Sequence, residues 1–392
     1  MNNFVYQNTT KVYFGNNQIS HLGEEIKKYG SHVLMVYGGG SIKKNGIYDN
    51  VMKVLKDADI QVTEFGGVEP NPQNTTVNRG TEVCRNNGID VVLAVGGGST
   101  IDASKVIAQA AFYDGDCWDL VTGKIKTDKA LPIFTVVTIA AAGSETDAWA
   151  VVSNADINDK IGPNSPFYQP KVSFLNPINT FTVSAYQTAA GSADILSHIT
   201  DCRYFIPEKK MEFVSEMMEV MAKSVIKYAP MAIAEPDNYE ARENLLWISS
   251  MITSGIMDIG SKADMIMHMM EHEISAYYDI NHGHGIAILM PHWMEYVLNE
   301  KTAPVFYRFG VKCLDIDPYL FDIDGAKQTI EALRDWFFNK LKLQSKLSDL
   351  GVDDKNFHAM AVKACNEGTN GMLCGLTSLT AQDLENIYRL SL

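Results

Sequence analysis

Histidines gather in one methionine-rich stretch of this chain, between His268 and His284. Four of the nine histidines lie there, and His268 and His272 are four residues apart. A helix brings residues at that spacing to one face, so the two imidazoles would point the same way. A turn predicted after Tyr277-Tyr278-Asp279 would bring His282 back toward them. This stretch is therefore the first candidate for metal chemistry.

A second pair, Asp194 and His198, has the same spacing and is surrounded by small apolar residues. Charged side chains are seldom buried without a partner, and a divalent cation would supply one. We therefore predict one metal site made by Asp194, His198, His268 and His282. This set contains no thiolate and suits Fe²⁺ as well as Zn²⁺, so we expect iron natively and zinc as a substitute.

Two glycine-rich loops each follow a predicted buried strand. Glycines let the backbone approach a ligand, and the helix that follows offers free N–H groups to an anion. Neither loop has the Gly-x-Gly-x-x-Gly spacing of the common dinucleotide fingerprint, so tight turning alone is the alternative to phosphate binding. The candidate phosphate-binding residues are Gly38, Gly39, Gly40 and Ser41 in the first loop, and Gly97, Gly98 and Ser99 in the second.

The first loop carries no acidic residue that could bind a ribose 2′-hydroxyl, and Lys43 and Lys44 follow it. This favours a 2′-phosphate there and the pyrophosphate on the second loop, although the two lysines could equally be solvated. Thr138 is expected to flank the nicotinamide. Asp102 could position the coenzyme or simply be a charge at a helix start.

The elements that would hold these residues differ between the two halves of the chain. Short β-branched runs alternate with amphipathic stretches from Ser31 to Asp102, which is typical of βαβ units over a parallel sheet. Strands are predicted at His32–Tyr37, Ile60–Phe65, Asp90–Val95 and Pro132–Thr138. After Phe181 helical spacing dominates, with helices predicted at Met211–Ala229, Asn238–Met257, Ile286–Leu298 and Ala326–Leu343. We predict an α/β parallel-sheet domain at 1–183 and an all-α domain at 184–392.

Composition excludes several classes of function. A formal net charge of −14 argues against a nucleic-acid or anionic-membrane surface, because either needs a basic face. The chain has no signal-peptide pattern and no apolar run long enough to span a membrane, so we expect a cytoplasmic protein. Its 6 cysteines are scattered, without the paired spacing of a zinc or redox motif.

Motifs along the whole chain are similar to those of the iron-containing (type III) alcohol dehydrogenase family, and within it to butanol-dehydrogenase-like, NADPH-dependent aldehyde reductases. These motifs are Phe14-Gly15, Tyr37–Gly46, Glu69–Pro72, Gly96–Ser99 with Asp102 and Lys105, Gly143–Glu145, Asp194 with His198, and His268–Gly283.

The resemblance implies a Rossmann-like dinucleotide-binding domain followed by an all-helical metal-binding domain. It also implies NADP(H) as coenzyme and a small aldehyde or primary alcohol as substrate. It maps the family's metal ligands onto Asp194, His198, His268 and His282. It makes His272 a non-ligand histidine beside the nicotinamide and substrate, where it would relay a proton or only orient them. Lys160 would reach the nucleotide, or be a solvated lysine. The expected partners are the substrate and a second copy of the chain.

Four residues depart from the family pattern: Asn176 replaces the usual Asp, Ala142 the usual Thr, and Asp201 the usual Glu, and His284 is unusual. None is a proposed ligand. They bear on substrate choice and catalytic efficiency.

Two other functions remain open from the sequence. His268, Glu271 and His272 also match the His-x-x-Glu-His pattern of inverted zinc peptidases, in which both histidines bind zinc and the glutamate activates water. A binding protein with the same fold and no turnover is the second. The peptidase requires His272 on the metal, whereas the dehydrogenase requires it free.

Overall fold

The computed structural model of the chain describes residues 2–207, 211–261, 263–366 and 368–392. These residues pack as two compact units, each described here by itself. The α/β unit comprises Gln7–Val183 and Asp237–Ser254, and the helical unit comprises Met1–Tyr6, Ser184–Pro236 and Gly255–Leu392.

Six parallel strands form the sheet of the α/β unit, in the order β1-β8-β5-β4-β2-β3. Their bounds are β1 (Lys11–Phe14), β2 (His32–Val36), β3 (Gln61–Phe65), β4 (Val91–Gly96), β5 (Ile133–Val137) and β8 (Val172–Leu175). Every residue of β4 and β5 is buried, as expected for central strands of a sheet covered on both faces. The Rossmann-like parallel sheet is confirmed.

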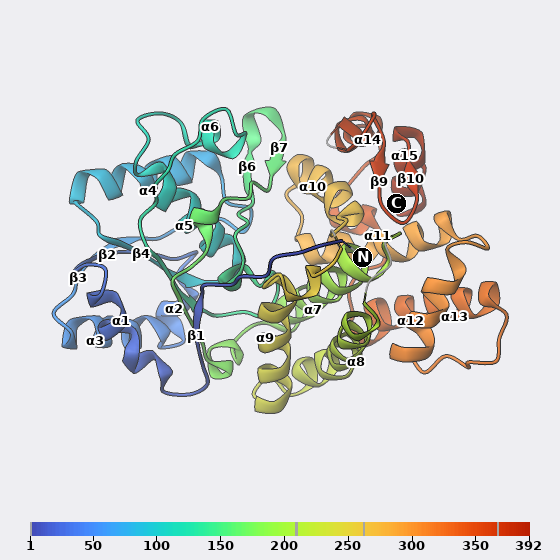
Figure 1. Cartoon of the computed structure of the whole chain (residues 1–392), viewed down its shortest axis with the longest axis horizontal. Coiled ribbons are helices and arrows are strands. Elements are labelled where there is room, and N and C mark those ends of the chain that lie inside the picture. The colour runs from blue at the N-terminus through green and yellow to red at the C-terminus, as the bar shows by residue number, and fades with distance from the viewer. Residues whose placement is uncertain (1, 208–210, 262, 367) are drawn as a thin grey trace. The chain divides into compact units, whose positions relative to one another are not determined.

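Helices cover both faces of this sheet. Successive side chains of a strand point to opposite faces, so Val33 and Met35 pack with α1 (Leu22–Lys27) and α3 (Ile47–Asp57). Leu34 packs on the other side, with α4 (Asn74–Asn87), α5 (Gly98–Ala110) and α6 (Cys117–Val121). Figure 1 shows α1 and α3 on one side of the sheet and α4 and α5 on the other.

The chain therefore leaves β2 toward one face, through α3, and leaves β4 toward the opposite face, through α5. β2 and β4 are neighbours in the sheet. A crevice at the carboxyl ends of two such strands is the usual ligand site of an open α/β sheet. Both glycine loops begin at these two strand ends.

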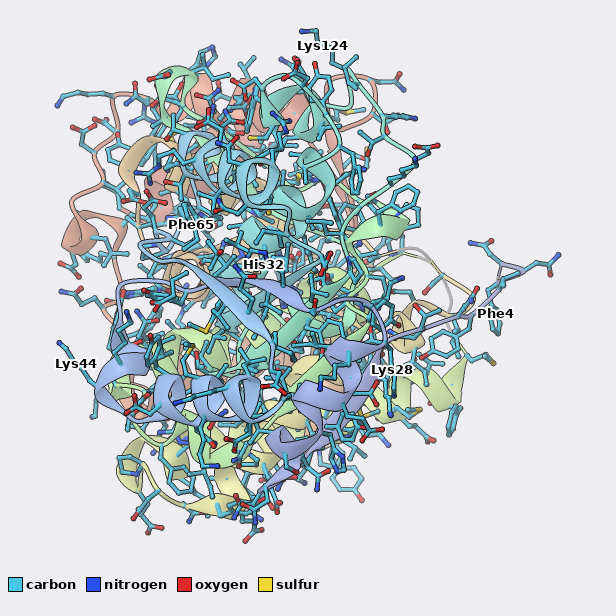
Figure 2. The ribbon with its side chains drawn as sticks, turned by 90° about the vertical axis from the view of Figure 1, so that its left-hand side faces the viewer. Phe4, Lys28, His32, Lys44, Phe65 and Lys124 are labelled. Atoms are coloured by element: carbon cyan, nitrogen blue, oxygen red, sulfur yellow. The ribbon has the colours of Figure 1, made fainter. Side chains whose placement is uncertain are left out.

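Figure 2 views the molecule from the left-hand side of Figure 1, where the edge strand β3 lies, and labels His32 on β2, Phe65 on β3 and Lys44. His32 Nε2 lies 2.9 Å from Thr63 Oγ1, so this isolated histidine joins β2 to β3 and has a structural role. Lys44 is exposed, in agreement with the solvated alternative for that residue.

Helices α7 (Ala185–Ile199), α8 (Glu212–Ala234), α10 (Ile266–Tyr278) and α11 (His282–Val297) form the centre of the helical unit. Helix α7 packs on α8 and α11, and α10 packs on α11 and α14 (Phe357–Asn366). Further α-helices of this unit are α12 (Ala303–Cys313), α13 (Asp322–Arg334) and α15 (Ala381–Leu390). None of the helices in the described part of the chain is both long and apolar enough to cross a membrane.

Two details differ from the predicted organisation. The short antiparallel strands β9 (Leu373–Cys374) and β10 (Ser378–Leu379) make the second half helical but not all-α. Two residues are too few to produce a period-two pattern.

The second difference is that the predicted limits of 1–183 and 184–392 treat each domain as one continuous segment. Helix α9 (Tyr239–Thr253) instead packs with the α/β unit, where Leu246 is buried among Ala94, Val137 and Leu175. Helical spacing shows that α9 has an apolar face and cannot show which unit that face covers.

Candidate active site

Three helices of the helical unit bring four of the predicted metal-site residues together. Helix α7 carries Asp194 and His198, α10 carries His268, and α11 begins at His282. Asp194 Oδ1 lies 3.5 Å from His198 Nδ1, 3.8 Å from His268 Nε2 and 3.8 Å from His282 Nε2. One carboxylate oxygen therefore faces three imidazole nitrogens.

These separations match a cation cage. With ligand bonds of about 2.1 Å, tetrahedral geometry places neighbouring ligand atoms about 3.4 Å apart. Asp194, His268 and His282 each offer one ligand atom, and these three atoms lie within 4.8 Å of one another. His198 is not part of this three-residue set. It contacts Asp194, and its ring centroid lies 4.6 Å from that of His268.

Two of the nitrogens in this cluster are unsatisfied. Within the described residues, His198 Nδ1 and His268 Nε2 are buried without a hydrogen-bond partner. Burial also lowers the pKa of His198 well below its usual value, so its imidazole is neutral, the form that binds metals. A buried orphaned nitrogen costs about 1–3 kcal/mol, which a cation would offset.

The local sequence explains how α11 comes so close to α7. A Cβ at Gly283 would lie 2.0 Å from Ala190 O and 3.2 Å from Asp194 Cβ, so only glycine fits beside the cage. Asp279 adopts φ 49° and ends α10, and the Asn281 side chain caps α11 by accepting from His284 N. These features make the predicted turn between His272 and His282.

His272 and His284 lie near the cluster and differ in role. The His272 ring is buried, with its centroid 5.3 Å from that of His282 and 6.4 Å from that of His268. His284 instead lies 3.2 Å from Tyr186 Oη through Nδ1 and 2.9 Å from the Gln344 carbonyl through Nε2. The unusual His284 is thus a structural residue of the helical unit.

Glu271 does not have the geometry of a peptidase base. It is fully buried, and its two carboxylate oxygens bind His282 Nδ1 and the Ser275 hydroxyl. A water-activating glutamate must reach solvent and substrate. The contact with His282 was not predicted from the sequence, because it joins α10 to α11.

The second glycine loop is tightly packed. Gly97 precedes α5, and a Cβ there would lie 2.4 Å from Ile139 Cγ2; one at Gly98 would lie 3.0 Å from Ala142 Cβ. Ser99 donates its hydroxyl to the Pro70 carbonyl, and Thr138 N donates to the Gly96 carbonyl at 3.1 Å. The Thr138 end of β5 therefore lies beside this loop.

The first glycine loop is open. Nothing lies within 4 Å of a Cβ built at Gly39 or Gly40, and only Gly40 has a positive φ, 92°. A Cβ at Gly38 would lie 3.3 Å from the Val68 carbonyl. Ser41 starts a four-residue helix, Ser41–Lys44. Packing explains Gly38 and backbone conformation explains Gly40, but neither explains Gly39.

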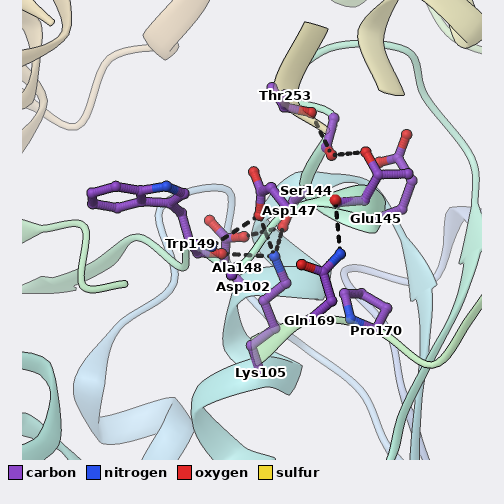
Figure 3. Close-up of polar contacts among 12 residues, drawn as sticks. Asp102, Lys105, Ser144, Glu145, Asp147, Ala148, Trp149, Gln169, Pro170 and Thr253 are labelled. Carbon is purple, nitrogen blue, oxygen red and sulfur yellow. Dashed lines mark hydrogen bonds and ion pairs between the residues drawn. The ribbon is translucent and has the colours of Figure 1, made fainter. Parts of the chain in front are cut away.

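Asp102 has both carboxylate oxygens occupied. It accepts from Ser144 Oγ at 2.5 Å (Figure 3). It also accepts from Val151 N at 2.9 Å. Burial raises its pKa to about 6, against the opposing charge of Lys105. These contacts join α5 to the 143–151 loop, so they support a structural role more than the predicted coenzyme contact.

Lys160 and Asn176 are also held within the α/β unit. Lys160 is buried on the β6–β7 hairpin (Val152–Asn154 and Asp159–Ile161), opposite Ser153, which argues against a solvated lysine. Asn176 accepts from Ile178 N at 3.1 Å. An aspartate would make the same cap, so this departure from the family pattern leaves the local fold unchanged.

Comparison with known proteins agrees with this architecture. Residues 9–177 match the family described as iron-containing alcohol dehydrogenase, and residues 188–392 match the C-terminal domain of the Fe-containing alcohol dehydrogenase family. The chain belongs to the iron-containing alcohol dehydrogenase family. It is a metal-dependent oxidoreductase of alcohols and aldehydes, and nothing in these comparisons supports the zinc hydrolase.

Relatives align over nearly the whole chain. NADH-dependent butanol dehydrogenase B of Clostridium acetobutylicum is 46% identical over 391 residues, covering 100% of both chains. The NADPH-dependent aldehyde reductase YqhD of Escherichia coli is 34% identical over 373 residues, covering 94% of each. The crystal structure of NADH-dependent butanol dehydrogenase A from Thermotoga maritima has a TM-score of 0.93 at 36% identity, covering 100% of this chain and 99% of that one.

Proposed function

We propose that this enzyme transfers hydride between NADP(H) and a small aldehyde or primary alcohol, and that Asp194, His198, His268 and His282 hold its metal. One observation carries this proposal: Asp194 Oδ1 faces three imidazole nitrogens at 3.5–3.8 Å. The donor set fits Fe²⁺, with Zn²⁺ as a substitute, because it combines imidazole with one carboxylate and no thiolate.

The bound cation supplies Lewis-acid polarisation of a carbonyl oxygen, and the coenzyme supplies the hydride. The protein's part is to hold the two reactants together and exclude water. His272, one helical turn from His268, is the proposed proton-relay residue, exchanging the alcohol proton with solvent. Its position supports this role, because its ring centroid lies 6.4 Å from that of His268 and 5.3 Å from that of His282.

The proposed coenzyme site is the crevice at the ends of β2 and β4. Gly97, Gly98 and Ser99 would receive the pyrophosphate at the start of α5, with Thr138 toward the nicotinamide and Lys160 on the nucleotide. Gly39 supports a 2′-phosphate on the first loop. Neither close packing nor a positive φ requires glycine at this position, so room for a ligand is the reason that we propose for it.

Glu64, at the end of β3, is the carboxylate that packs beside the first loop through Tyr37 and Lys43. Tyr48 Oη, Lys43 Nζ and Tyr37 Oη contact it at 2.6, 3.0 and 2.8 Å. The hydrogen bond from Tyr48, ahead of those from Lys43 and Tyr37, lowers the pKa of Glu64. These contacts occupy Glu64, so NADP(H) is proposed although both butanol dehydrogenases named above are described as NADH-dependent.

Gly39→Asp tests this coenzyme assignment without disturbing the fold, since a side chain at Gly39 meets open space. It would place a carboxylate against the 2′-phosphate. We expect NADPH to bind about 10-fold more weakly, the effect of about 1.4 kcal/mol, with NADH unchanged. Equal losses for both coenzymes, measured by fluorescence titration, would contradict the placement.

Butanal with NADPH tests the reaction itself. We expect oxidation of NADPH with butanal and no cleavage of peptide substrates. A protein that binds NADPH and metal but leaves butanal unreduced would favour the binding-protein alternative.

The enzyme is also proposed to act in the cytoplasm as a homodimer. Its cysteines form no disulfide among the described residues, which agrees with a reducing compartment.

A further inference from the structure

The two cage histidines of α10 and α11 each contact a buried carboxylate on the side away from Asp194. His268 Nδ1 lies 3.2 Å from Asp201 Oδ2, and His282 Nδ1 contacts Glu271 Oε2. The Nε2 atoms of both rings lie 3.8 Å from Asp194 Oδ1. In each imidazole, Nδ1 thus contacts an outer carboxylate, Asp201 or Glu271, while Nε2 faces Asp194.

Both outer carboxylates are fixed by further contacts. Asp201 is 2% exposed and accepts from Met267 N at 3.2 and 3.1 Å through its two oxygens. It lies in a π-helical turn at Thr200–Tyr204 that follows α7 directly, and such turns frequently occur at functional sites. Arg203 holds that turn by donating to the His198 carbonyl at 3.0 Å.

Glu271 is held in the same way. It is 0% exposed, and Ser275 donates its hydroxyl to Oε1. Gly285 of α11 leaves room for it, because a Cβ there would lie 2.8 Å from Glu271 Cγ and 3.1 Å from Oε1. Burying a carboxylate without purpose is costly, so two such groups on the two outer nitrogens need an explanation.

We infer that Asp201 and Glu271 are positioning residues that set the tautomer and orientation of His268 and His282, and so the metal affinity of the cage. A carboxylate accepts hydrogen bonds and donates none, so each Nδ1 carries the proton and each Nε2 keeps its lone pair for a cation. This inference rests on the proposed metal site and adds residues that act through its ligands.

The sequence spacing shows how the arrangement is built. Asp201 follows His198 by three residues and holds His268; Glu271 follows His268 by three residues and holds His282. The turn after α7 thus supports the ligand on α10, and α10 supports the ligand at the start of α11. Cys202 Sγ also lies 3.4 Å from His268 Nδ1, but a thiol is a weak hydrogen-bonding group and would not replace Asp201.

Zinc affinity of purified variants tests this inference without any assay of turnover. Competition with a chromogenic chelator should show Zn²⁺ binding about 10–100-fold more weakly to Asp201→Asn and to Glu271→Gln than to the wild type. The matched control is Glu273→Gln. Glu273 is on the same helix and 1% exposed, but it pairs with Lys363 at 3.3 Å. Wild-type affinity is expected for it.

Wild-type zinc affinity in Asp201→Asn and Glu271→Gln would overturn the inference. An equal loss in Glu273→Gln would also overturn it, by showing a general effect of buried charge. If both charge variants fail to fold, Gly285→Ala still decides, because it displaces Glu271 without removing its charge. It should weaken Zn²⁺ and change the visible spectrum of bound Co²⁺; unchanged binding and spectrum would overturn the inference.

These outcomes are separable from the proposed function. If the wild type does not reduce butanal and the variants still bind zinc more weakly, the positioning role is supported and the hydride-transfer reaction is contradicted. Reduction of butanal by variants with unchanged zinc affinity would do the reverse.

Discussion

Each unit buries a cluster of charged side chains, one around Lys105 and one around Asp194, and the two clusters use their polar atoms differently. In the α/β unit, Lys105 is 0% exposed and contacts Ser144 Oγ, Asp147 Oδ1 and the Trp149 carbonyl at 2.8, 2.6 and 2.7 Å (Figure 3). All three protons of its ammonium group are used. In the helical unit, His198 Nδ1 and His268 Nε2 converge on Asp194 without making a hydrogen bond among the described residues.

This difference separates structure from chemistry. A buried charge whose hydrogen bonds are complete fixes a loop, here the 143–149 segment against α5. Buried nitrogens that converge on one carboxylate oxygen without hydrogen bonds leave room for a ligand that is not part of the chain. Burial is common to both clusters; the completeness of hydrogen bonding distinguishes them.

The largest expected effect is on the helical cluster. His268→Ala removes one of the three imidazoles that face Asp194. We therefore expect the protein to lose stoichiometric metal, as measured by elemental analysis after purification without chelator. His358→Ala is the control, because His358 is exposed and pairs with Glu385. Full metal retention by His268→Ala would contradict the assignment.

The next effect tests the Lys105 cluster. Lys105→Met keeps the length of the apolar stem but leaves Asp147 and Asp102 without their cation. Removing one partner of a buried ion pair typically costs about 3–5 kcal/mol, so urea denaturation should show a loss of that size. Metal content should not change. A variant that loses metal but keeps its stability would reverse the roles given to the two clusters.

His272→Ala tests whether a buried histidine beside the cage takes part in turnover. We expect turnover to fall by roughly 10²-fold, the scale of a lost acid–base group, while metal and NADPH binding stay nearly intact. Turnover is measured from steady-state rates across a range of pH, and metal content is measured by elemental analysis. Wild-type turnover with an unchanged pH profile would make His272 a bystander.

The smallest effect is a pH dependence of stability at Glu145, beside the Lys105 cluster. Burial raises its pKa from 4.5 to about 6, with the Ser250 hydrogen bond opposing. The folded state therefore binds the proton more tightly, and this stabilisation is present below pH 4.5 and lost as pH rises through 6. A shift of 1.5 units corresponds to about 2 kcal/mol.

Glu145→Gln removes this titration. The wild type should therefore lose about 2 kcal/mol relative to the variant between pH 4 and 7, measured by urea denaturation at each pH. A constant difference across that range would show that the carboxyl group keeps its ordinary pKa.

The sequence predicted the parts of this molecule that depend on local spacing. The four strands it named, β2, β3, β4 and β5, are observed. The central strands β4 and β5 are fully buried and read as continuous apolar runs. The edge strand β1 and its neighbour β8 were missed; each has only four residues, and their pairing joins segments far apart in the chain. The proposed ligands were selected from i, i+4 spacing and from the family resemblance.

The remaining contacts depend on tertiary packing. Asp201 drew attention only as a departure from the family pattern, and Glu271 only as part of a peptidase motif. Their contacts with His268 and His282 join different helices, which no spacing rule connects. Asp102 seemed equally suited to a coenzyme contact and a helix start, and only the positions of Ser144 and Val151 show what occupies it.

The central claim is that the histidine cluster holds a catalytic metal, and its most direct test is the metal dependence of NADPH oxidation with butanal. The wild-type protein is stripped with a chelator, assayed, and assayed again after Fe²⁺ or Zn²⁺ is added back. We predict that stripping abolishes NADPH oxidation and that refilling restores it in the wild type but not in His268→Ala. Undiminished oxidation by the stripped protein would contradict the account.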